Sequence, residues 1–215
     1  MNTDERWDRL LGIRTTGRDD SRSDTYHYPY EPTPYSVLER LSSSGLLRKG
    51  NHLLDMGCGK GRVGFFLAYE TRCTCTGIDF DARMIEIAER NRLHAVSGSR
   101  VRFINKPAEN YKIPDSVDRI YFFNPFSTEI LLKVLTRLRE SWYSTPRTIL
   151  LFIYYPSFGF RDTLTADPLL VMDSEIDCRD LFKSSDPRER ILVFRTVEPD
   201  GIEGRSESNV IFQEK

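Results

Sequence analysis

Residues 53–64 read LLDMGCGKGRVG, an apolar segment that leads into Asp55 and then into glycines at 57, 59, 61 and 64. Glycine lets the backbone turn sharply and lets a ligand approach main-chain N–H groups without meeting a Cβ atom. Residues 59–64 also match the Gly-x-Gly-x-x-Gly pattern of dinucleotide sites. The stretch therefore predicts a strand, a nucleotide-binding turn and the start of a helix.

Short apolar segments alternate with helical patterns from this stretch onward. The strand-like segments are HLLDM (52–56), TCTGID (74–79), VRFI (101–104) and DRIYFF (118–123), and helical patterns cover 62–70, 82–91 and 129–140. This alternation is typical of βαβ units, so we expect a doubly wound α/β fold around a mostly parallel sheet. After TILLFIYY (148–155), strands near 169–173 and 190–197 have too little helix between them for a crossover, which predicts an antiparallel hairpin at the sheet edge.

The segments that flank this core differ from it in composition. Residues 1–25 mix charges of both signs with little apolar periodicity, which predicts a mobile arm with one short helix. Prolines in YHYPYEPTPY (26–35) exclude a regular helix there, and Thr33 as N-cap with Pro34 at the first helical position predicts a helix that stops near Gly45. We expect one domain over 26–197 with an N-terminal cap at 26–45, followed by a tail or edge strand at 198–215.

Composition excludes several classes of protein. The 31 Lys and Arg residues nearly balance the 32 Asp and Glu residues, so no overall charge excess draws the chain to nucleic acid or anionic lipid. The longest apolar run, 149–155, is far shorter than the roughly 18 residues of a membrane span, and we expect a soluble, cytoplasmic protein. The four cysteines lack the spacing of a metal site, so buried thiols and metal-free chemistry are expected.

Two carboxylates indicate the kind of nucleotide. Asp79 ends the strand after the glycine turn, where a carboxylate can accept hydrogen bonds from both hydroxyls of a ribose, and Phe80 beside it can lie on an adenine ring. Asp55 precedes the glycines, where it would repel a pyrophosphate but attract an ammonium group. An adenosine with a cationic amino-acid end fits this pattern, and S-adenosylmethionine has that structure. A nicotinamide-dependent oxidoreductase remains the alternative from another enzyme class.

Three motifs, DMGCGKG (55–61), GIDFD (77–81) and FFNPF (122–126), together resemble those of the seven-stranded, class I S-adenosylmethionine-dependent methyltransferases. The likeness extends over about residues 29–197 and implies a three-layer, Rossmann-like fold with a seven-stranded sheet. It also implies that Asp55, Gly57 and Gly59 surround the methionine part of the cofactor and that Asp79 holds the ribose. The other expected cofactor-binding residues are Thr33, Cys58, Gly61, Phe80, Ala108 and Asn124. The usual acidic adenine contact has no clear counterpart in INKPAENY (104–111), where Ala108 or Glu109 stands in its place.

The acceptor of the methyl group is indicated less directly. Asn124-Pro125-Phe126 is similar to the Asn/Asp-Pro-Pro-Tyr/Phe motif of amino-group methyltransferases, but it has one proline and its aromatic residue comes one place early. YEPTP (30–34) resembles the leader of small protein lysine methyltransferases. We therefore expect a nitrogen acceptor, a protein lysine or another amine, with an amino group of nucleic acid or a non-catalytic S-adenosylmethionine-binding module as alternatives.

An amine must lose its proton before it can attack a methyl group. The candidate bases are Glu31, Tyr154, Tyr155 and His27, and Tyr154 is assigned to the catalytic group with Asn124, Pro125 and Phe126. Residues 26–35 are expected to fold over the carboxyl edge of the sheet and to cap the cofactor.

Overall fold

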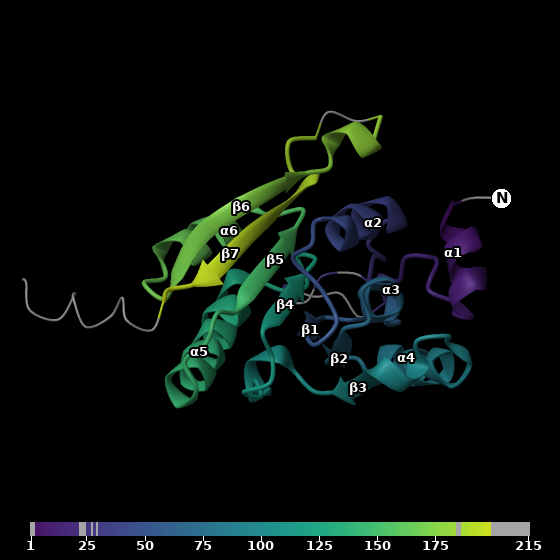
Figure 1. Cartoon of the computed structure of the whole chain (residues 1–215), viewed down its shortest axis with the longest axis horizontal. Coiled ribbons are helices and arrows are strands. Elements are labelled where there is room, and N and C mark those ends of the chain that lie inside the picture. The colour runs from purple at the N-terminus through teal and green to yellow at the C-terminus, as the bar shows by residue number, and fades with distance from the viewer. Residues whose placement is uncertain (1–2, 22–24, 27, 29, 184–185, 199–215) are drawn as a thin grey trace, which may run out of the picture.

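A seven-stranded sheet forms the centre of the computed structural model, which describes residues 3–21, 25–26, 28, 30–183 and 186–198. The strand order is β3-β2-β1-β4-β5-β7-β6 (Figure 1). The first five strands are parallel, and β7 is antiparallel to both of its neighbours. The predicted parallel sheet with its C-terminal hairpin is confirmed. The strands are β1 (His52–Met56), β2 (Thr74–Asp79), β3 (Val101–Asn105), β4 (Arg119–Phe122), β5 (Leu150–Tyr154), β6 (Leu170–Asp177) and β7 (Arg190–Thr196).

Helices cover both faces of the sheet (Figure 1). Successive residues of a strand point to opposite faces, so Leu53 belongs to one core and Leu54 to the other. The core around Leu53 takes apolar residues from α2, α3 and α4, and the core around Leu54 takes them from α5 and α6. The result is the predicted three-layer arrangement. The helices are α1 (Thr3–Leu11), α2 (Tyr35–Ser43), α3 (Arg62–Thr71), α4 (Ala82–His94), α5 (Thr128–Ser144) and α6 (Phe158–Ala166).

The strand order reverses beside β1, whose neighbours are β2 on one side and β4 on the other. In open α/β sheets the crevice at the carboxyl ends of such strands is where ligands bind. The leader, defined here as the described residues of 25–34, crosses this edge. The Tyr28 N–H donates to the Pro125 carbonyl at 3.3 Å, and the Ser127 N–H donates to the Tyr26 carbonyl at 2.9 Å. The leader therefore lies along the loop that joins β4 to α5.

Two predictions about the N-terminal region differ from the structure. Residues 3–21 are not a mobile arm, because α1 packs on the sheet-covering helices and Leu11, Ile13 and Asp8 are buried. Thr33 is not an N-cap: α2 starts after Pro34, which caps without a side-chain hydrogen bond, and the Thr33 hydroxyl instead pairs with that of Tyr121.

Predictions for the cysteines and for the C-terminal part of the chain have different outcomes. The four cysteines are buried free thiols, as expected. Helix α6 was not predicted from the sequence. The expected tail or edge strand lies almost wholly outside the described residues, since only Glu198 of that segment is among them. No helix within the described residues has the length and apolar character to cross a membrane.

Candidate active site

The glycine-rich loop after β1 turns over the end of β2. Gly57 and Gly59 have φ angles of 80° and 51°, which L side chains rarely adopt. A Cβ on Gly57 would lie 2.5 Å from the Cβ of Pro125, and a Cβ on Gly59 would lie 2.2 Å from the ring of Tyr30. The N–H groups of Gly57 and Cys58 donate to the Ile78 carbonyl at 2.9 Å. The loop therefore needs glycine both for its backbone shape and for the close approach of its neighbours.

Asp79 connects this loop to the end of β2. Its Oδ2 accepts a hydrogen bond from the Gly59 N–H at 2.9 Å, and its Oδ1 accepts one from the Asp81 N–H at 2.9 Å. A carboxylate oxygen can accept more than one hydrogen bond, so this geometry is compatible with a further bond to a ribose hydroxyl. Phe80 follows with 37% of its surface exposed, at the rim of the cavity described next.

A cavity that is partly open to solvent lies at the carboxyl ends of β1, β2 and β4. It brings together most of the residues expected at the cofactor, and it is lined by Thr33, Asp55, Gly57, Cys58, Asp79, Phe80 and Ala108, with Pro125 and Phe126 on the β4 side. We call it the cofactor cavity. Gly59 and Gly61 shape the loop beside it but are not part of its lining.

Asp55 is a deeply buried acidic residue in the lining of the cofactor cavity. Its side chain is 3% exposed, and its Oδ2 has no hydrogen-bond partner among the described residues. Burial, helped by the nearby charge of Asp79, raises the pKa of Asp55 to about 8. A buried carboxylate without a partner is costly, so the site is suited to a cationic group of a ligand.

Ala108 and Glu109 are the two residues that the sequence offers at the adenine end. Both Ala108 and Glu109 line the cofactor cavity, and the Oε2 of Glu109 is buried without a partner in the described part of the chain. An amino group such as that of adenine would donate to this oxygen. The sequence offered Glu109 only as one of two alternatives.

Asn124 lies where the cofactor cavity meets a second one. Its φ of 42° places it in the left-handed region, directly after β4 and Phe123. Its Oδ1 is buried and accepts no hydrogen bond from the described residues. The second cavity, which we call the acceptor cavity, shares Tyr28, Glu31 and Phe123 with the first. Its other lining residues are Arg18, Pro34, Asn124, Tyr154, Tyr155, Phe182 and Glu189.

The neighbours of Asn124 differ in what they do. Pro125 packs on Gly57, and its carbonyl accepts a hydrogen bond from the Tyr28 N–H. Phe126 is 4% exposed and packs against Phe122 and Phe160, so most of its ring belongs to the core. Asn124 thus lines the acceptor cavity, whereas Pro125 and Phe126 line the cofactor cavity and pack behind it.

The candidate bases can now be compared. The Tyr154 hydroxyl donates to Glu189 Oε2 at 2.6 Å, and burial together with that bond raises the pKa of Tyr154. The hydrogen bond to Asp186 and burial raise the pKa of Tyr155. Both phenols therefore stay protonated at neutral pH and are poor bases. Glu31 lines both cavities, whereas His27 lies outside the described residues.

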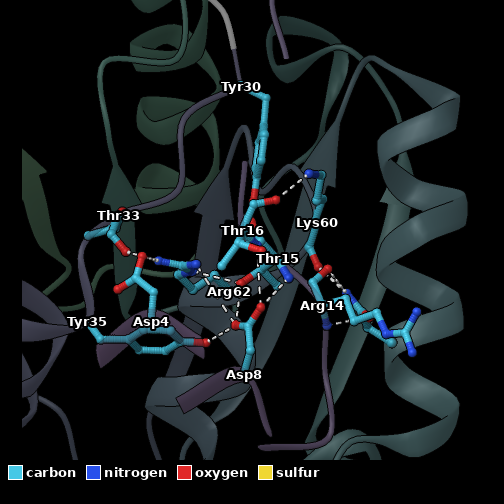
Figure 2. A network of polar contacts seen from close by, with 11 residues as sticks. Asp4, Asp8, Arg14, Thr15, Thr16, Tyr30, Thr33, Tyr35, Lys60 and Arg62 are labelled. Atoms are coloured by element: carbon cyan, nitrogen blue, oxygen red, sulfur yellow. Dashed lines mark hydrogen bonds and ion pairs between the residues drawn. The ribbon is translucent and has the colours of Figure 1, made fainter. Parts of the chain in front are cut away.

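A buried polar network joins the N-terminal region to the glycine-rich loop (Figure 2). Arg62 directly follows Gly61 and is 2% exposed. Its guanidinium donates to Asp4 Oδ2 at 2.8 Å, to Thr15 Oγ1 at 2.7 Å and to the Thr33 carbonyl at 3.2 Å. This role was not predictable from the sequence, because an arginine inside a glycine-rich motif gives no sign that its partners lie more than 25 residues earlier.

Asp8 is the second centre of this network. It accepts hydrogen bonds from the Thr15 N–H, the Thr15 hydroxyl and the Tyr35 hydroxyl, at 2.6, 2.7 and 2.6 Å. Its Oδ1 lies 3.9 Å from the guanidinium of Arg62. On the other side of Thr15, Tyr30 donates its hydroxyl to the Thr15 carbonyl, and Lys60 donates to the Thr16 carbonyl (Figure 2). Hydrogen bonds thus join residues 4–16 to the leader and to the glycine-rich loop.

Comparisons with known proteins bear on this site. Residues 53–141 match a family described as a methyltransferase domain. Methyltransferase GfsG from Streptomyces halstedii is 30% identical over 112 residues, which are 46% of this chain; the chain spans only 40% of the length of that relative.

Solved structures share the architecture at low identity. An RNA methyltransferase from Salinibacter ruber, in complex with S-adenosyl-L-homocysteine, is 18% identical with a TM-score of 0.52, covering 79% of this chain and 95% of its own. Magnesium protoporphyrin IX methyltransferase from Synechocystis PCC 6803, with bound S-adenosylmethionine, is 18% identical with a TM-score of 0.56, covering 76% and 77%. At this identity the likeness shows the fold, and the predicted Rossmann-like, seven-stranded fold is confirmed.

Proposed function

We propose that this chain, which carries a methyltransferase domain in the fold of the S-adenosylmethionine-dependent methyltransferases, transfers a methyl group from that cofactor to a nitrogen atom. The enzyme class and the cofactor agree with the domain match and with the ligands of similar structures. The acceptor is argued from the site alone, because the titles of those structures name acceptors as different as RNA and a porphyrin.

The cofactor cavity offers partners for three parts of S-adenosylmethionine. The Oδ2 of Asp55, which has no partner among the described residues, suits the ammonium group. Asp79 suits the ribose hydroxyls, and Phe80 with Glu109 suits the adenine. The close packing around Gly57 leaves main chain rather than side chain at the turn. When bound, the cofactor supplies a methyl group on a positively charged sulfur, which needs a nucleophile but no metal.

Asn124 is the observation that carries the proposed acceptor. Its buried Oδ1 has no partner among the described residues, yet it borders the acceptor cavity next to the cofactor cavity. An amide oxygen accepts an N–H hydrogen bond, and an amine held in this way keeps its lone pair for the methyl carbon. Orientation of this kind accelerates transfer by placing the two reacting atoms within near-attack distance.

The leader packs against the same site. Tyr30 lies over Gly59, and Tyr28 binds the Pro125 carbonyl and lines both cavities. These contacts support the proposal that the leader caps the cofactor and excludes water from the transfer.

One experiment tests the proposal. Purified protein and labelled S-adenosylmethionine are added to a cell extract, which is then separated into protein, nucleic-acid and metabolite fractions. The label should enter a fraction through an N–CH3 bond, and Asn124→Ala should lose about tenfold or more in rate while keeping its affinity for S-adenosylhomocysteine.

Two results would contradict it. Equal losses of affinity and rate in Asn124→Ala would place Asn124 at the cofactor instead of the acceptor. Cofactor binding without label in any fraction would favour the non-catalytic module.

A further inference from the structure

We infer that the acceptor cavity binds an alkylammonium group, and that Glu189 receives its proton before methyl transfer. This inference rests on the proposed function and deepens it. It concerns one chemistry, a primary amine on an aliphatic chain, which both a free amine and a lysine side chain carry.

The wall of the acceptor cavity is aromatic. The ring centroids of Phe123 and Tyr154 are 4.8 Å apart, and the ring of Tyr155 lies 6.4 Å from the first and 6.1 Å from the second. These three rings form one continuous surface from the end of β4 to the end of β5. Aromatic faces attract cations and also accept the methylenes of an alkyl chain.

The charges of the cavity favour a cation. Glu31 and Glu189 both line it. Arg18, the one cation among its described lining residues, is bound to Asp20 at 2.7 Å and lies 3.7 Å from Glu31. Glu189 forms no ion pair within the described part of the chain. Its Oε2 accepts the Tyr154 hydroxyl, which holds the carboxylate against the aromatic wall.

The arginines that flank Glu189 in sequence are engaged elsewhere. Arg188 binds Asp186 at 2.8 Å and lies over the ring of Tyr155, and Arg190 binds Glu175 at 3.1 Å. Neither arginine forms an ion pair with Glu189 within the described part of the chain. An ammonium group in the cavity would form an ion pair with Glu189.

The chemistry balances with these groups alone. The ammonium gives one proton to the carboxylate of Glu189 and becomes a neutral amine. One N–H of the amine donates to Asn124 Oδ1, and its lone pair forms the new bond to the methyl carbon. The methyl–sulfur bond breaks, its electron pair stays on sulfur, and the products are a methylammonium and S-adenosylhomocysteine.

The test uses the full-length protein with labelled S-adenosylmethionine and three defined acceptors: n-hexylamine, a short glycine peptide with one lysine, and n-hexanol as the uncharged match of n-hexylamine. Label should enter at least one amine and not the alcohol. Label in n-hexylamine alone indicates that the natural acceptor is a small molecule, and label in the peptide alone indicates that it is a protein lysine. Label in neither amine overturns the inference.

Matched variants test the role of Glu189. Glu189→Gln keeps an oxygen for the Tyr154 hydroxyl but cannot take a proton, so its kcat/KM for the amine should fall about tenfold or more, with the deficit largest at low pH. Glu175→Gln removes a carboxylate from the same hairpin but outside both cavities, and it should behave as wild type. Wild-type rates and an unchanged pH profile in Glu189→Gln overturn the assigned role.

Calorimetry with S-adenosylhomocysteine separates this inference from the proposed function. If only this inference is wrong, the protein should still bind S-adenosylhomocysteine tightly and transfer label to a component of the extract, but no label should enter the two defined amines. Failure of S-adenosylhomocysteine to bind would instead contradict the proposed function itself.

Discussion

Asp55 combines deep burial with a carboxylate oxygen that has no partner among the described residues. Because burial and Asp79 raise its pKa to about 8, the cofactor-free protein holds Asp55 mainly protonated at neutral pH. A cationic amino group would bind the ionised form. Cofactor binding should therefore release a proton from Asp55.

The first prediction follows from this linkage. The free protein has the raised pKa and the complex a lower one, so the complex binds fewer protons and affinity rises with pH until about pH 8. The affinity for S-adenosylhomocysteine should increase about tenfold or more between pH 6 and pH 8. Calorimetry in two buffers of different ionisation enthalpy measures both the affinity and the protons released.

Asp55→Asn provides the control for the pH dependence. It removes the titration and should bind S-adenosylhomocysteine with an affinity that is nearly constant across this range. A wild-type affinity that is equally constant would show that Asp55 does not pair with the ligand.

The second prediction concerns Asp79. Asp79→Ala removes the proposed ribose partner and the acceptor of the Gly59 and Asp81 N–H groups. Affinity for S-adenosylhomocysteine should fall about tenfold or more, since hydrogen bonds to a charged group contribute roughly 1.5–3 kcal/mol each. Asp162→Ala, at an exposed position of α6, is the matched control. Unchanged affinity in Asp79→Ala would remove this residue from the site.

At the scale of elements, α1 contributes charge to the interior. Asp8 is 7% exposed, and Arg62 at the start of α3 is 2% exposed. Removal of one partner from such a pair leaves the other buried without compensation, which typically costs about 3–5 kcal/mol. Replacement of both by apolar residues costs much less.

The third prediction tests this coupling. Asp8→Ala should lower the free energy of unfolding by about 3 kcal/mol, and Arg62→Met in the same background should restore part of the loss. Urea unfolding followed by circular dichroism gives both values. Additive losses in the double variant would mean that Asp8 and Arg62 act independently. By the same reasoning, deletion of residues 1–25 is expected to impair the protein, contrary to the expectation of a mobile arm.

The alternation of elements was predictable because each strand and helix carries its own periodicity. Residues 129–140 show the apolar stripe of α5, and TILLFIYY shows the continuous burial of β5. The glycine turn and Asp79 were predictable because their geometry is local to 20 residues or so of chain. These elements needed no knowledge of distant contacts.

Other features depend on contacts between distant parts of the chain. The charges of α1 resemble those of an exposed arm, and Asp8 is buried because Thr15, Tyr35 and Arg62, all outside α1, surround its carboxylate. Thr33 has the residue type of an N-cap, but the hydroxyl of Tyr121 takes its hydrogen bond. Glu189 was missed for the same reason, since it reaches the acceptor cavity from the hairpin that closes the sheet.

At the scale of the whole molecule, the cofactor cavity is lined by segments that lie far apart in the sequence. The leader, the glycine-rich loop, β2 and the β4–α5 loop all line it. A ligand there stabilises the folded protein as a unit, because it binds the native arrangement and not the unfolded chain. The midpoint of thermal unfolding therefore distinguishes between classes of ligand.

The last prediction uses this property to separate the two cofactors that the glycine pattern allowed. S-adenosylhomocysteine at about 100 times its Kd should add about 2.7 kcal/mol to the free energy of unfolding. For a domain of this size, that corresponds to a rise in Tm of roughly 5–11 °C. NAD at the same concentration should leave Tm unchanged, because its pyrophosphate carries no cation to pair with Asp55 and would be repelled by the ionised form of that side chain. Asp55→Asn removes that repulsion without creating a dinucleotide site, so NAD should remain without effect on this variant while S-adenosylhomocysteine gives a smaller rise. A rise with NAD on the wild-type protein would contradict the assignment of the cavity, and differential scanning fluorimetry measures all four cases.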